Sequence, residues 1–172
     1  MGPQKKSRVV TETDKKCTAY HEAGHAILAK LCEHNDNVHE VSIIPRGSAA
    51  GYTLTRPETD DSSYTVNQLN DMICMALGGR VAEELVIHDI SAGASSDIRK
   101  VTQIARKMVT EWGMSDKLGL MALSTVSNPY LDGSTMMNCA DSTSSAADEE
   151  IHKLLMDCYA DAKKLLVEHR SL

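Results

Sequence analysis

The segment from Asp14 to about His34 places apolar residues at intervals of three and four, which is the period of an amphipathic α-helix. Within it, TAYHEAGHAIL puts His21 and His25 four residues apart, and Glu22 directly follows the first histidine. Positions four apart lie on one face of a helix, one turn from each other. Two imidazoles at this spacing can bind one Zn²⁺ at about 2.0–2.1 Å each. The adjacent carboxylate can take the proton of a metal-activated water, which is the chemistry of H-E-x-x-H sites.

The H-E-x-x-H pattern alone leaves a plainer alternative open, because two half-exposed histidines on an amphipathic helix also produce it. A zinc site needs a third protein ligand as well, and six residues qualify by type: His34, His39, Glu83, Glu84, His88 and Asp97. Glu83 and Glu84 are expected on a helix after a glycine pair, where solvated charges are common. Asp97 is expected in the first turn of another helix, where the helix dipole favours an acid. Spacing and local physics do not decide between Glu83 and Asp97.

The rest of the chain predicts a mainly α fold with one small β-hairpin or short sheet. The runs EVSII (40–44) and GYTLT (51–55) flank a connection that contains proline and glycine, which is typical of two short paired strands. Helical periods return over 64–87, 91–113 and 148–172, and Ser95 or Ser96 is expected to cap the middle helix. Residues 124–145 are rich in Ser, Thr, Asn and Gly, and we predict a loop there. The order α-ββ-α-α-α lacks the strand–helix alternation of a parallel sheet.

One glycine pair inside a predicted helix is costly and needs a reason. Gly78 and Gly79 interrupt the run MICMALGGRVAEELVI, and each costs about 1 kcal/mol of helix stability against alanine. A close crossing with another helix would explain why both are tolerated.

Composition limits the class of protein. A chain of 172 residues, 42% of them hydrophobic, is long enough for one domain with its own core. The net charge of -6 without a basic stripe makes nucleic acid an unexpected partner. The five cysteines are scattered and contain no C-x-x-C pair, which favours reduced thiols over a disulfide framework. The sequence contains no apolar run near the roughly 20 residues that a membrane span needs.

Several ordered motifs together resemble the peptidase domain of the FtsH family of ATP-dependent, membrane-anchored zinc proteases. They are TAYHEAGHAIL, VSIIPRG, GYTL, LGGRVAEEL, GASSDI and MVTEWGMSDKLG, and they extend over nearly the whole chain. The resemblance implies a helical metalloprotease domain with one Zn²⁺ per chain, held by His21 and His25, and Glu22 as the catalytic base. It selects Asp97, the aspartate of GASSD, as the third ligand. It places Glu83 beside the ligands, where such residues orient them.

The resemblance also implies how substrate binds. Gly51, Tyr52, Thr53 and Leu54 would form a strand beside the catalytic cleft. An unpaired edge of that strand could align an extended polypeptide through backbone hydrogen bonds, which tolerates many sequences. We therefore expect unfolded polypeptides as substrates.

The chain differs from family members in what surrounds this domain. Relatives carry membrane segments and an AAA ATPase module, which uses ATP and Mg²⁺, but this sequence has no G-x-x-x-x-G-K-[ST] loop. We expect 1–13 to be a lead-in from a missing ATPase module and 14–172 to be the zinc peptidase domain, truncated at its C-terminal end. The resemblance implies that the full-length protein is a homo-hexamer at the cytoplasmic face of the bacterial inner membrane, attached only through the missing segments. This fragment is expected to be soluble.

Two other functions stay open at this level. The fragment could be a ring-assembly module whose zinc is structural or absent. It could also use zinc on a substrate that is not a peptide, which only the resemblance disfavours. An intact Glu22 beside the two histidines favours chemistry over a structural site, because a structural zinc needs ligands but no base.

Overall fold

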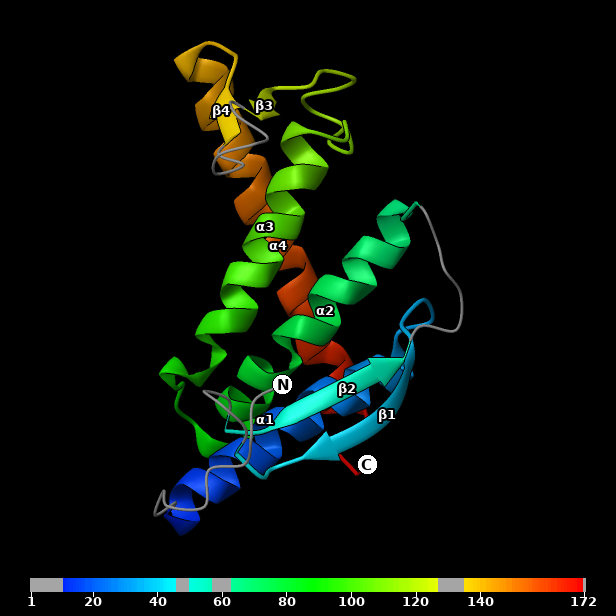
Figure 1. Cartoon of the computed structure of the whole chain (residues 1–172), viewed down its shortest axis with the longest axis vertical. Helices are drawn as coiled ribbons and strands as arrows, with labels where there is room; N and C mark the ends of the chain where they lie inside the picture. Colours follow the sequence, from blue (N-terminus) through cyan, green and yellow to red (C-terminus); the bar gives the residue numbers. More distant parts are fainter. Residues whose placement is uncertain (1–10, 46–49, 57–62, 127–134, 172) are drawn as a thin grey trace.

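The computed structural model describes residues 11–45, 50–56, 63–126 and 135–171, and every structural statement below concerns these ranges. The elements, in chain order, are α1 (Glu12–Leu31), β1 (Asn37–Ser42), β2 (Tyr52–Arg56), α2 (Val66–Ala82), the π-helix η1 (Glu83–Ile87), the 3-10 turn η2 (Ala92–Ala94), α3 (Ser95–Thr110), β3 (Ser124–Val126), β4 (Thr135–Met137) and α4 (Asp141–Glu168). The predicted mainly α fold with a small β-hairpin is confirmed (Figure 1).

Helices α1 and α2 both start with a capping box, so their first turns are set by local sequence. The Thr11 side chain accepts from the backbone N–H of Asp14, and the Asp14 carboxylate accepts from the N–H of Thr11. Thr65 and Gln68 make the same reciprocal pair at the start of α2. Such pairs satisfy two N–H groups that a helix end otherwise leaves without partners.

The two helices cross at a pair of glycines. A Cβ atom on Gly78 would lie only 2.6 Å from the backbone oxygen of Gly24, so no larger residue fits while the helices stay this close. This contact confirms the close crossing predicted from the glycine pair, as far as Gly78 is concerned. Beside it, Leu28 of α1 and Ile73 of α2 are fully buried and join the helices through the core.

Strands β1 and β2 form an antiparallel pair that lies against α1 (Figure 1). The register places Thr53 opposite Val41 and Leu54 opposite Glu40, with an irregularity between Val38 and Glu40. The first strand begins three residues before the predicted run 40–44, and Ile43 and Ile44 lie beyond its end.

Helices α3 and α4 pack side by side along the long axis of the molecule and complete the core (Figure 1). The start of α3 differs from the prediction that Ser95 or Ser96 caps it. Ala94 occupies the N-cap without a side-chain bond, and the N–H of Ser95 donates to Ala92. The 3-10 turn η2 leads directly into the helix and uses its own carbonyl for this N–H group, so no serine cap is needed.

The predicted loop over 124–145 is wrong in two places. Ser124–Val126 pairs with Thr135–Met137 as a second antiparallel ladder, and α4 already begins at Asp141. Tertiary contacts override the polar composition here. The N–H of Leu123 donates to Thr110 of α3 at 2.7 Å and the N–H of Asn138 donates to Leu123 at 2.8 Å, which fixes the first strand. The first turns of α4 are polar, and they extend a helix whose buried side chains, from Ala147 onward, pack in the core.

Two other predictions concern the chain as a whole. Helix α1 begins at Glu12, and residues 1–10 of the predicted lead-in lie outside the described ranges, so the division at residue 13 stays a prediction. Of the helices in the described part of the chain, none combines the length and the apolar character that crossing a membrane requires.

Candidate metal centre

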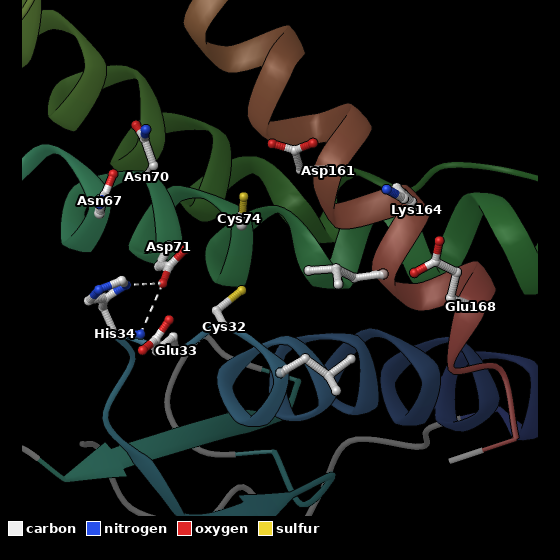
Figure 2. A pocket seen from close by; sticks show the side chains of 12 residues that line it. Cys32, Glu33, His34, Asn67, Asn70, Asp71, Cys74, Asp161, Lys164 and Glu168 are labelled. Atoms are coloured by element: carbon white, nitrogen blue, oxygen red, sulfur yellow. Dashed lines mark hydrogen bonds and ion pairs between the residues drawn. The ribbon is translucent and has the colours of Figure 1, made fainter.

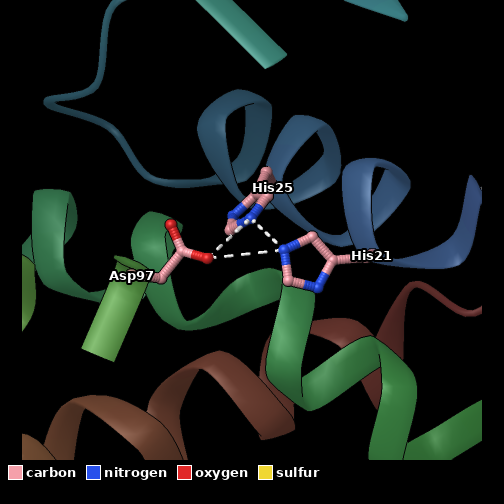
Figure 3. A group of neighbouring side chains, drawn as sticks. All are labelled: His21, His25 and Asp97. Atoms are coloured by element: carbon pink, nitrogen blue, oxygen red, sulfur yellow. Dashed lines mark hydrogen bonds and ion pairs between the residues drawn. The ribbon is translucent and has the colours of Figure 1, made fainter. Parts of the chain in front are cut away.

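Three side chains from two helices converge on one point. His21 and His25 project from successive turns of α1, and Asp97 projects from the first turn of α3 (Figure 3). Their ligand atoms all lie within 4.8 Å of one another, and they form the one such group of three or more in the described ranges. The structure therefore brings together the two histidines and the one third-ligand candidate that the resemblance selected.

The hydrogen bonds of both histidines determine which ring nitrogen faces this point. His21 Nδ1 lies 2.8 Å from Oε1 of Glu83, and His25 Nδ1 lies 2.8 Å from the backbone oxygen of Met75. A carbonyl only accepts, and so does an ionised carboxylate, so each Nδ1 carries the proton. Both Nε2 atoms then present lone pairs, and they face each other at 3.0 Å. With the Asp97 carboxylate as a third donor of electrons, the group requires a cation or a proton between its members.

The spacing of the three ligand atoms fits Zn²⁺. The two Nε2 atoms are 3.0 Å apart, and they lie 3.4 and 3.8 Å from Oδ2 of Asp97. The circle through three points with these separations has a radius of about 2.0 Å, which equals the usual zinc–nitrogen and zinc–oxygen distance. The edges of a tetrahedron with such bonds would be about 3.3–3.4 Å, close to the three separations. The residues therefore fit the ion without rearrangement.

The pKa values of the two histidines are shifted in opposite directions. Burial lowers the pKa of the His21 imidazole, but hydrogen bonds to Asp97 and Glu83 outweigh burial, so its pKa lies above the usual value. Burial also lowers the pKa of His25, and there it prevails, so this imidazole stays neutral more readily. The carboxylates that face His21 account for the difference.

Glu83 lies outside the converging group, because it contacts the His21 ring at Nδ1, on the side away from Nε2. Its carboxylate is 2% exposed, and three donors surround it: His21 Nδ1 at 2.8 Å, the Ser91 N–H at 2.7 Å and the Ser91 hydroxyl at 3.0 Å. Glu83 is the first residue of η1, and π-helical turns often occur at functional sites. Glu83 therefore lies beside His21, and Asp97 is the member of this pair that belongs to the converging group, while the ligand roles stay predictions.

Gly79 forms the floor beneath His21. A Cβ atom at this position would lie 2.5 Å from both Cε1 and Nε2 of the His21 ring. The glycine pair thus has two separate functions, since Gly78 allows the helices to cross and Gly79 makes room for an imidazole.

Glu22 lies next to the group and contacts the β-hairpin. It is 6% exposed, and its Oε2 accepts a hydrogen bond from the Thr53 hydroxyl at 2.7 Å. Gly51 packs against the same helix, because a Cβ there would lie 2.9 Å from Cγ of Glu22. Tyr52 donates from its hydroxyl to Glu40 of β1 at 2.5 Å. Of the predicted substrate-binding residues, Gly51 and Thr53 therefore contact Glu22, the Tyr52 hydroxyl bonds to Glu40, and Leu54 lies opposite Glu40 in the register.

The remaining third-ligand candidates lie elsewhere. Glu84 accepts from Lys163 at 2.8 Å and from the Tyr159 hydroxyl, both on α4. His39 and His88 are exposed. His34 bonds through its N–H and Nδ1 to Asp71, at the edge of a pocket of about 430 Å³ between the end of α1, α2 and α4 (Figure 2). None of these four belongs to the converging group within the described residues.

Sequence reasoning missed Ser91, Gly79 as the floor of His21, and the Met75 carbonyl. Ser91 precedes a turn and gives a capping signal only, because it accepts from the N–H of Gly93 at 3.1 Å. A backbone carbonyl is present at every residue, so no sequence signal distinguishes the one at Met75. The contacts of Met75 and Gly79 join residues that are distant in the chain, and only the packing of α1 against α2 creates them.

Comparison with known proteins gives a consistent picture. Residues 8–172 match the sequence pattern of peptidase family M41. The chain is 47% identical over 171 residues to "ATP-dependent zinc metalloprotease FtsH 2" of Alkaliphilus metalliredigens, and 48% identical over 172 residues to "ATP-dependent zinc metalloprotease FtsH" of Ruminiclostridium cellulolyticum. These alignments cover 98% of this chain but only 25% and 28% of the relatives, so the chain spans about a quarter of their length. On this evidence the chain belongs to peptidase family M41.

Proposed function

We propose that this chain is a zinc-dependent endopeptidase domain that hydrolyses peptide bonds of unfolded polypeptides. The observation that carries the proposal is the convergence of three electron-pair donors on one point, with the Glu22 carboxylate beside it. A structural zinc site has no use for such a carboxylate. The names of the two relatives, which describe zinc metalloproteases, support the same function.

Each residue of the group has a distinct role in the proposed reaction. His21, His25 and Asp97 would hold one Zn²⁺, and the ion would supply a Lewis acid for the peptide carbonyl and lower the pKa of a water toward about 7. Glu22 accepts the proton of the attacking water on its carboxylate. It then delivers this proton to the amine nitrogen that leaves when the peptide bond breaks. Glu83 keeps the proton on Nδ1 of His21, so that Nε2 stays available.

Strand β2 is the proposed guide for the substrate. In the described ranges it pairs with β1 on one edge only, and its other edge has no strand partner. An extended polypeptide could add to that edge through backbone hydrogen bonds, which explains how a protease accepts many sequences. Proline at Tyr52 or Leu54 should then reduce cleavage of an unfolded protein, and unchanged cleavage by a folded variant would exclude this mode of binding.

The longer relatives suggest the setting in which the domain works. We infer that the full-length protein joins this domain to an ATPase module that uses ATP and Mg²⁺ to unfold and deliver substrates. We also infer a homo-hexamer at the cytoplasmic face of the bacterial inner membrane, attached through segments outside this chain. The word "ATP-dependent" in the relatives' names supports the first inference, and the resemblance to the FtsH family supports the second.

The deciding experiment is cleavage of casein, an unfolded protein, by the zinc-loaded chain and by Glu22→Gln. Removal of a general base should lower turnover about 10²- to 10⁴-fold and leave one zinc per chain, because Glu22 is not among the ligand atoms. Glu33→Gln is the matched control, since Glu33 is an exposed glutamate just beyond the end of α1. Equal turnover by the parent and Glu22→Gln would refute the proposal. If neither cleaves casein, even when fused to an ATPase module, the ring-assembly function takes its place.

A further inference from the structure

We infer that Thr53 is a positioning residue that holds the Glu22 carboxylate through its hydroxyl group, an inference that rests on the proposed function. The resemblance suggested Thr53 as a contact for substrate. Its side chain instead points to α1, where it reaches the carboxylate expected to move the proton. Thr53 then acts on the reaction through Glu22, and only its backbone remains for the substrate.

The geometry of the contact selects the carboxylate as the partner of the hydroxyl proton. Thr53 Oγ1 lies 2.7 Å from Oε2 of Glu22 and 3.2 Å from the Glu22 backbone oxygen. A hydroxyl has one proton to donate, and 2.7 Å is typical of an O–H···O⁻ bond to an ionised group. The backbone oxygen is also the acceptor of α1's own helical ladder. The proton therefore goes to Oε2.

This bond leaves the two carboxylate oxygens unequal. No hydrogen bond to Oε1 of Glu22 comes from the described residues, and Oε1 is not among their fully buried atoms without a partner. Oε1 is thus the oxygen that this bond leaves available to accept a proton from water. A carboxylate tied at one oxygen cannot rotate freely, so its other oxygen keeps a constant direction, which proton transfer at hydrogen-bond distance requires.

The position of β2 makes the bond possible. Gly51, one residue before the strand, lies so close to α1 that a Cβ would be 2.8 Å from Cγ2 of Thr18 and 2.9 Å from Cγ of Glu22. On its other side, the strand is held by β1, with Thr53 opposite Val41. The strand proposed to align substrate is therefore the same strand that orients the base. A shift of β2 away from α1 would therefore disturb both the alignment of the substrate and the orientation of the Glu22 carboxylate.

Three variants at two positions separate this role from simple packing. Thr53→Val removes the hydroxyl and keeps the shape of the side chain, whereas Thr53→Ser keeps the hydroxyl. Thr55→Val is the control: it makes the same threonine-to-valine change two residues further along β2, at a residue that does not bond to Glu22. Loss of a hydrogen bond to a charged group predicts that Thr53→Val lowers kcat on an unfolded peptide about 10- to 100-fold. KM and zinc content should stay near those of the parent. Thr53→Ser and Thr55→Val should keep kcat within about threefold.

A second readout does not depend on turnover or on metal. The carboxyl ¹³C resonance of Glu22, assigned by its loss in Glu22→Gln, should shift in metal-free Thr53→Val and stay in place in Thr53→Ser and Thr55→Val. If Thr53→Val folds poorly, the Thr53 hydroxyl proton of the parent decides: slow exchange with water supports the bond, and fast exchange refutes it.

The outcomes distinguish the two proposals. Unchanged kcat and an unmoved Glu22 resonance in Thr53→Val would overturn the positioning role. An equal loss of kcat in Thr53→Ser would also overturn it, because a retained hydroxyl would then fail to sustain the reaction. Equal turnover by the parent and Glu22→Gln would instead overturn the proposed function. In that case the ¹³C comparison alone still establishes or refutes the hold of Thr53 on Glu22.

Discussion

Replacing Gly79 by alanine should weaken metal binding and hardly change the stability of the fold. The Cβ atom would lie 2.5 Å from Cε1 and Nε2 of His21, whereas ordinary contact begins at 3.4 Å. The ring must therefore retreat by about 0.9 Å. Metal ligands keep their distances to within about 0.2 Å, so His21 Nε2 would leave the position that its lone pair needs.

The changes in zinc affinity and in stability that Gly79→Ala causes both depend on which atoms must move. Loss of an outer partner alone costs about 10- to 100-fold in metal affinity, and displacement of a ligand should cost at least that much. Stability should change little, because the atoms in contact are the end of one side chain. Alanine also favours a helix interior by about 1 kcal/mol over glycine, which offsets much of the strain.

Gly78→Ala is the matched control with the opposite expectation. Its Cβ would lie 2.6 Å from the backbone oxygen of Gly24, so the cost falls on the crossing of α1 and α2. Overpacking of this kind lowers the free energy of unfolding by about 1–3 kcal/mol. Thermal unfolding in the presence of a chelator measures stability, and competition with a chromophoric zinc chelator measures affinity.

The reasoning fails on either of two results. Zinc affinity of Gly79→Ala equal to that of the parent would show that the His21 ring does not need the space above Gly79. A drop in stability as large as that of Gly78→Ala would show that backbone, and not one side chain, absorbs the strain.

Three further predictions test the surroundings of the site. Asp97→Ala should bind zinc at least about 100-fold more weakly, since a ligand is lost, and full occupancy by chelator competition would contradict the assignment. Ser91→Ala should weaken zinc binding less than tenfold, because its backbone N–H still donates to Glu83 at 2.7 Å; an effect as large as that of Asp97→Ala would exclude so minor a role. Burial raises the pKa of Cys32 to about 12, and Cys74 and Cys158 are also buried, so a disulfide reagent at pH 8 should modify two of the five thiols in the folded chain. Rapid modification of all five without denaturant would contradict that burial.

The sequence by itself determined the local parts of this protein. The helical period predicted α1 and α2, and two β-rich runs on either side of a connection with proline and glycine predicted the hairpin. The spacing of His21 and His25 predicted two imidazoles on one face, because positions four apart on a helix are always neighbours. These features depend on residues that are near each other in the chain, so their physics can be read from the sequence.

Only the tertiary structure decided which distant residues complete the site. Glu83 and Asp97 were indistinguishable by spacing and local physics. The tertiary structure places Asp97, in the first turn of α3, beside Nε2 of His21 and Glu83, at the start of η1, beside Nδ1. The packing of β2 against α1 brings Thr53 to Glu22, and the turn after η1 brings Ser91 back to Glu83. The short strand at Ser124–Val126 likewise depends on a tertiary contact, because the N–H of Leu123 donates to the backbone oxygen of Thr110 in α3. Its own composition predicted a loop. Contacts between distant segments depend on the whole core, which is why local patterns did not predict them.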